Sequence, residues 1–116
     1  MTQKEITING KTFPVVFTVK TMMGFEDITG KSFFGEKFRT IGNKTALVFA
    51  AIIAADEKAD LTMDDLMNAD QVETLNDIGN AFTTVNELAD EFFHIPAVEP
   101  QPEQAEESEE GDNQKN

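Results

Sequence analysis

The sequence contains no cysteine, tryptophan or tyrosine, and it has no apolar run of membrane-spanning length. The absence of cysteine excludes disulfides and thiolate chemistry and is typical of proteins in a reducing cytoplasm. The longest apolar run, Ala46 to Ala55, has ten residues, whereas a membrane-spanning helix needs about 20. Residues 1–5 also lack the apolar stretch of a signal peptide. We therefore expect a cytoplasmic protein whose longest apolar run forms core.

Basic residues are scarce: nine Lys and Arg stand against 22 Asp and Glu, so the net charge is −13. Such a charge repels nucleic-acid backbones and anionic membrane surfaces, so we expect neither as a partner. Residues 96–116 contain seven acids, one base and three prolines. Because that segment has little apolar surface to bury, we expect a disordered acidic tail. Residues 1–95 then form a single domain.

The N-terminal residues have the pattern of a β-hairpin. Residues 6–8 and 13–19 are rich in β-branched and aromatic side chains. Between them, Asn9-Gly10 suits the positive φ angles of a type I′ turn. Pro14 lacks an N–H, so the second strand is expected at an edge, or bulged there.

The rest of the domain has helical spacing. We expect a helix over 21–28 ended by Gly30, a buried helix over about 43–56 and a short helix capped by Thr62. A long amphipathic helix should follow, with apolar residues from Val72 to Phe93 and an end before Pro96. The segment Asp70 to Glu73 repeats the capping signal of Thr62 to Asp65. Residues 32–39 suit either a short helix or an apolar loop. The prediction is an α+β domain in which a hairpin packs on a small bundle of about four helices.

None of the chemical motifs satisfies its own spacing. Residues 24–32 approach a phosphate-binding loop, but five residues separate the glycines where four are needed. Residues 56–67 approach a calcium loop, but Leu61 replaces the turn glycine and Met67 replaces the bidentate glutamate. His94 is the only histidine, and a lone histidine at a helix end is typical of a favourable dipole interaction. We predict no catalytic, cofactor or metal site.

Three runs resemble a known family: ITINGKTF at 6–13, FTVK at 17–20 and FEDITGKSF at 25–33. They resemble the tail assembly chaperones of long-tailed bacteriophages and prophages of Gram-positive bacteria. The order of elements is similar over about 1–95, including the LTMDDL cap at 61–66 and the Phe92-Phe93 ending. The resemblance implies a non-catalytic chaperone that keeps the tape measure protein soluble in the host cytoplasm and is absent from the mature virion. It also implies a possible contact with the tail-tube protein.

Bulky apolar side chains near the ends of elements are the candidates for the partner surface. We predict that this surface contains Met22, Met23, Phe33, Phe34, Phe38, Phe92 and Phe93. Methionine-rich surfaces adapt to helical partners, and Met63 and Met67 add to the apolar excess. The competing interpretation is that all of these side chains are core.

Three other functions stay open from the sequence. A structural tail or head–tail joining subunit would persist in purified particles. An acidic mimic of nucleic acid would use the net charge of −13 to block a DNA-binding protein. An enzyme would require an acid whose neutralisation abolishes turnover. Self-association is compatible with each of them.

Overall fold

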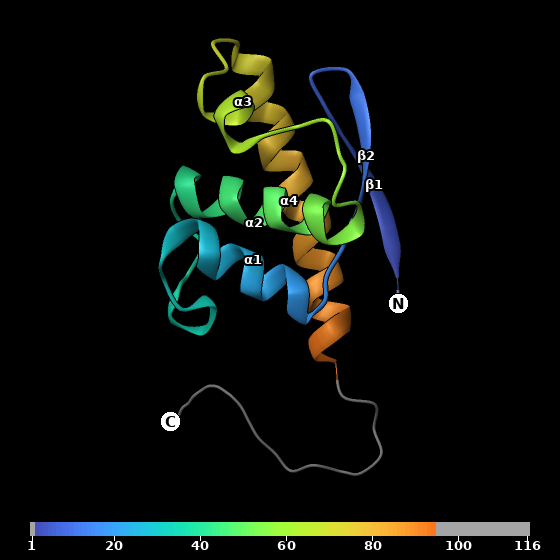
Figure 1. Ribbon diagram of the computed structural model, residues 1–116, viewed down its shortest axis with the longest axis vertical. Helices are drawn as coiled ribbons and strands as arrows, with labels where there is room; N and C mark the ends of the chain where they lie inside the picture. Colours follow the sequence, from blue (N-terminus) through green and yellow to red (C-terminus); the bar gives the residue numbers. More distant parts are fainter. Residues whose placement is uncertain (1, 95–116) are drawn as a thin grey trace.

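The computed structural model describes residues 2–94, which form a β-hairpin and four α-helices (Figure 1). The elements are β1 (Gln3–Ile8), β2 (Lys11–Val16), α1 (Val19–Thr29), the 3₁₀ turn η1 (Phe33–Gly35), α2 (Ile41–Ala55), α3 (Met63–Met67) and α4 (Val72–Phe93). The predicted α+β class, with a hairpin packed on four helices, is confirmed. The acidic tail predicted at 96–116 lies outside the described residues.

The hairpin forms around the predicted turn. Asn9 and Gly10 have φ angles of 54° and 81°, as a type I′ turn requires. The strands pair antiparallel from Ile8 opposite Lys11 to Gln3 opposite Val16. Hydrogen-bonded and non-hydrogen-bonded pairs alternate along the ladder, beginning with the hydrogen-bonded pair Ile8 and Lys11 beside the turn. Pro14 therefore falls in a non-hydrogen-bonded pair, where no N–H is directed at the partner strand. Both strands of this two-stranded sheet are edges, so the proline costs no ladder bond.

The second strand is shorter than predicted. It ends at Val16 rather than Val19 because Val19 is already the first residue of α1. The buried Thr21 hydroxyl donates to the carbonyl of Val16 at 3.0 Å and accepts the N–H of Thr18 at 3.1 Å. One threonine side chain therefore ends the strand and starts the helix, which β-propensity alone does not reveal.

Helix α2 is the centre of the core, as its apolar sequence predicted. It packs against α1, β2 and α4, and Val48, Ala51 and Ile52 are fully buried or nearly so. The helix begins at Ile41, two residues before the predicted start, because the Thr40 hydroxyl accepts the N–H of Asn43 at 3.1 Å. Figure 1 shows α1 beside α2, with the long α4 crossing them near the hairpin.

The last two helices begin in different ways. Helix α3 has the predicted capping box, in which Thr62 and Asp65 each accept the other's backbone N–H at 3.1 and 2.9 Å. Helix α4 starts at Val72, the first of the apolar residues predicted to lie in it, and its N-cap is Gln71, which makes no side-chain capping bond. The capping role predicted for Asp70 is therefore wrong.

Instead, the hairpin turn holds the start of α4. The hydroxyl of Thr74 donates to the Asn9 side-chain oxygen at 2.5 Å, and Asp77 accepts the Asn9 N–H at 3.0 Å. These bonds fix the first turns of α4 against the hairpin through side chains, and they leave the backbone N–H groups that a cap would satisfy without a bond from the turn. Among residues 2–94, no helix is both long and apolar enough to cross a membrane.

Candidate partner-binding groove

The structure divides the seven predicted partner residues between core and surface. Phe33 is 9% exposed and belongs to the core, while Met22 and Phe38 are partly buried against it. The prediction that Phe33 lies on the partner surface is therefore wrong. Phe34 is 76% exposed, and Met23, Phe92 and Phe93 are exposed to a smaller extent.

Phenylalanines from three segments meet at the C-terminal end of α4. The Phe33 ring centroid lies 5.8 Å from that of Phe17 and 5.3 Å from that of Phe34, and Phe34 lies 6.1 Å from Phe93. Phe92 completes the group at 5.3 Å from Phe17. Three predicted residues, Phe34, Phe92 and Phe93, therefore form one exposed aromatic end above a buried aromatic floor.

Residues 32–39 combine the two predicted alternatives, a single 3₁₀ turn followed by a loop. Phe38, in that loop, has a φ of 53°, a left-handed conformation that bulky residues rarely adopt. Its ring packs 5.0 Å from Phe25 and 5.3 Å from Phe33. Burial of the ring offsets the backbone strain.

Met23 lies elsewhere on the molecule. It lines a separate hollow of about 340 Å³ between α1 and α2, beside Phe49 and Ile53. The structure therefore does not bring Met23 together with the exposed phenylalanines.

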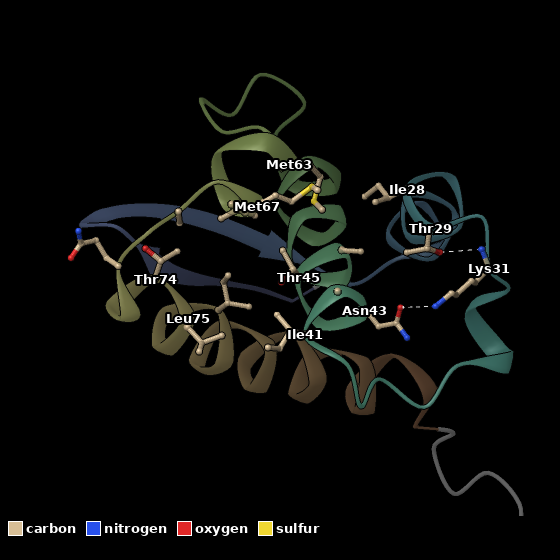
Figure 2. A pocket seen from close by; sticks show the side chains of 16 residues that line it. Ile28, Thr29, Lys31, Ile41, Asn43, Thr45, Met63, Met67, Thr74 and Leu75 are labelled. Carbon is tan, nitrogen blue, oxygen red and sulfur yellow. Dashed lines mark hydrogen bonds between the residues drawn. The ribbon is translucent and has the colours of Figure 1, made fainter.

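A groove of about 640 Å³ lies where the end of α1, the start of α2, α3 and the first turns of α4 converge. Four of its apolar side chains are exposed: Ile28, Ile41, Met67 and Leu75. Its floor and walls also include Ala46, Met63, Leu66 and Ile78. Figure 2 shows Met63 and Met67 near the top of the groove, Ile28 and Lys31 to their right, and Thr45 below the methionines.

Most polar side chains of the groove are already paired. Lys31 approaches the Asn43 side-chain oxygen at 3.5 Å, and the Asn43 amide donates to Glu36 at 2.7 Å. Thr74 is held by the hairpin turn. Thr45 differs from them: the residue is 5% exposed and lines the groove, and its side chain forms no hydrogen bond with another residue of 2–94. The floor of the groove therefore carries one unpaired polar group.

Charge is unevenly distributed around the groove. Residues 59–94, which include α3 and α4, contain nine acids and neither Lys nor Arg. Asp64 and Asp70 each follow directly a residue that lines the groove, and both are exposed. Lys31 is the one charged residue among those that line it, and the nearby Glu36 carboxylate, 3.9 Å away, balances its charge. Of the nine acids, Asp60 and Glu87 pair with hairpin lysines and Asp77 accepts the Asn9 N–H, so the acidic rim of the groove is the exposed pair Asp64 and Asp70.

The residues of the rejected motifs have structural roles. Gly30 has a φ of 72° and its N–H donates to the Glu26 carbonyl at 2.8 Å, which confirms that it ends α1. Asp65 is part of the α3 capping box. His94 is an exposed residue at the C-cap of α4. Within 2–94, no three His, Asp or Glu side chains cluster as metal ligands would.

No family model matches the chain, and no curated protein or solved structure is detectably similar to it. The resemblance to tail assembly chaperones accordingly stays a prediction.

The groove itself was missed from the sequence. Ile41, Met67 and Leu75 come from three helices, and their convergence depends on how these helices cross. One signal was present: Met63 and Met67 were recognised as apolar side chains beyond the needs of a thin core. No local pattern marked Thr45, which is one of many polar residues in helices.

Proposed function

We propose that this chain is a phage tail assembly chaperone that binds the tape measure protein and keeps it soluble in the host cytoplasm, without catalysis. The observation that carries the proposal is the open apolar groove on a strongly acidic domain. Exposed apolar surface of this kind marks interaction sites. The order of elements, from the hairpin to the helix ending in Phe92-Phe93, agrees with the order that the resemblance implies.

The groove suits reversible binding. Full burial of one large aliphatic side chain stabilises a complex by about 1.5–3 kcal/mol. Four such side chains are exposed along the groove: Ile28, Ile41, Met67 and Leu75. Association costs about 4–15 kcal/mol in lost freedom. These side chains alone therefore give modest affinity. Modest affinity is what a chaperone needs if tail-tube subunits are to displace it from its partner.

The acidic balance suits the same role. Residues 1–95 carry 15 acids and eight bases, and the remaining residues add seven acids and one base. Net charge far from zero keeps protein complexes from associating with one another. A complex of this chain with an aggregation-prone helical protein would therefore repel other such complexes.

Coexpression with the tape measure protein of the same phage or prophage tests the proposal. We expect the wild-type chain to move the tape measure protein into the soluble fraction. The pair Met67→Ser and Leu75→Ser should abolish this effect. The control is Val19→Ser, because Val19 is also an exposed apolar side chain but lies outside the groove.

The mature particle supplies the decisive contrast. A chaperone should be missing from purified virions, which mass spectrometry can establish. Recovery of the chain in finished tails would instead identify a structural subunit. Capture of DNA-binding proteins, with the tape measure protein still insoluble, would identify an acidic mimic.

A further inference from the structure

We propose that the groove binds an amphipathic α-helix that carries lysine or arginine along the flank facing α3 and the start of α4. This inference deepens the proposed function by giving the chemistry of the segment that is held. It depends on two features of the groove, its helical walls and its acidic rim, and the Thr45 hydroxyl on its floor provides a further test.

The walls favour a helix over an extended segment. They are the sides and ends of α1, α2, α3 and α4, and none of them presents the alternating donors and acceptors of a strand edge. An extended peptide would leave its own backbone groups unpaired there, whereas a helix pairs them internally. The strands β1 and β2, which do have free edges, contribute no residue to the groove.

The rim determines the charge of the partner. Asp64 follows Met63 on α3, and Met63 lines the groove. Asp70 lies between Ala69 and Gln71, which also line it. No Lys or Arg occurs from residue 59 to residue 94 to neutralise them. A helix seated on Met67 and the residues around it therefore lies near two carboxylates that form no ion pair within residues 2–94, and a basic flank fits them.

The floor adds a constraint that charge does not. Thr45 lines the groove and is 5% exposed, and its hydroxyl has no partner within the described residues, so in the free protein it bonds to water in the groove. A purely aliphatic stripe docked above it would remove its access to water without replacing the hydrogen bond. Thr45→Val removes that cost, so it should tighten the binding of an aliphatic helix rather than weaken it.

The probe is a synthetic helix of about 18 residues, roughly 27 Å long. It has leucine at positions i, i+3, i+4 and i+7 and lysine along one flank, and a second peptide replaces the lysines with glutamine. Calorimetry measures the affinity of each for the full chain. Labelled methionine methyl groups report the position, because Met63 and Met67 line the groove and Met22 and Met23 do not.

Two variants with the same charge change separate the rim from the net charge. Asp64→Asn with Asp70→Asn neutralises the rim, and Asp90→Asn with Glu91→Gln neutralises two exposed acids near the other end of α4. We expect the rim pair to weaken the lysine peptide about fivefold and the distal pair less than twofold. The glutamine peptide should respond to neither. Thr45→Val should tighten both peptides by about fivefold.

Each other outcome overturns the inference in a recognisable way. Equal loss from both acid pairs would mean general attraction to the net charge. Methyl shifts at Met22 or Met23, without shifts at Met63 and Met67, would place the helix elsewhere. Absence of peptide binding would exclude a helix-binding groove. If the tape measure protein is nevertheless solubilised, the chaperone function holds and uses another surface.

Discussion

Two adjacent phenylalanines provide the most direct test of how the structure separates core from surface. Phe33 is 9% exposed, and its ring lies within 6.4 Å, centroid to centroid, of five other phenylalanine rings. Phe34, the next residue, is 76% exposed. Truncation of each to alanine makes the same chemical change in the same 3₁₀ turn. Any difference in stability must therefore arise from the environment of the side chain.

The expected difference is large. Phe→Ala in a core costs about 3–5 kcal/mol, because transfer energy is lost and a cavity is left, whereas an exposed truncation costs under about 1 kcal/mol. For a domain of this size, 1 kcal/mol lowers Tm by roughly 4–8 °C. We therefore expect Phe33→Ala to lower Tm by at least about 12 °C and Phe34→Ala by no more than about 8 °C.

Far-UV circular dichroism is the suitable assay, since the chain has neither Trp nor Tyr for fluorescence. Thermal and urea unfolding of both variants should give the same order of stability. Equal losses from the two truncations would refute the burial argument. A loss of unfolding free energy below about 1 kcal/mol for Phe33→Ala would also refute it, because truncation of a core ring costs more than that.

Three further predictions concern backbone, floor and charge. Gly30→Ala should destabilise the fold by about 1 kcal/mol, because Gly30 has a φ of 72°. Gly79→Ala, in open space within α4, should stabilise it by about 0.5–1 kcal/mol. Urea unfolding measures both changes, and a change of the same sign in both variants would contradict the backbone argument. Thr45→Val should change the unfolding free energy by no more than about 0.5 kcal/mol, because water in the groove hydrates the hydroxyl of the free protein; a loss of about 1 kcal/mol or more would show that the hydroxyl has a partner in the protein. A hydrogen bond from Lys20, together with the Lys20 charge, lowers the pKa of Glu57. The Lys20–Glu57 interaction is therefore fully present at pH values above the ordinary pKa of a carboxyl group, and it is lost as the pH falls through the lowered pKa. Carboxyl NMR titration should show that Lys20→Met returns the Glu57 pKa to its ordinary range.

Sequence patterns predicted the elements whose signals are local. The turn at Asn9-Gly10, the end of α1 at Gly30 and the capping box of Thr62 each depend on residues within one turn of chain. The predictions failed where a distant contact decides. Asp70 has the local signature of a cap, but the start of α4 is held by the hairpin turn through Asn9. Local propensity cannot anticipate such a contact.

The partner surface was harder to predict because bulk does not distinguish core from surface. Phe33 and Phe34 are identical in type and adjacent in sequence, yet they have opposite environments. Within a 3₁₀ turn no alternation identifies the inward side chain. The groove required still more, since Ile41, Met67 and Leu75 meet only after three helices have packed. A pattern read along the chain gives the apolar excess but not its location.

The runs that carry the family resemblance are mainly the parts that build the fold. Asn9 and Gly10 form the turn, Phe25 and Phe33 are core, and Gly30 ends α1. Substitutions there would abolish binding by unfolding the domain, whatever the function. The exposed side chains of the groove from α2, α3 and α4 lie outside these runs. Variants of those side chains leave the core intact, so they are the changes that separate partner binding from folding.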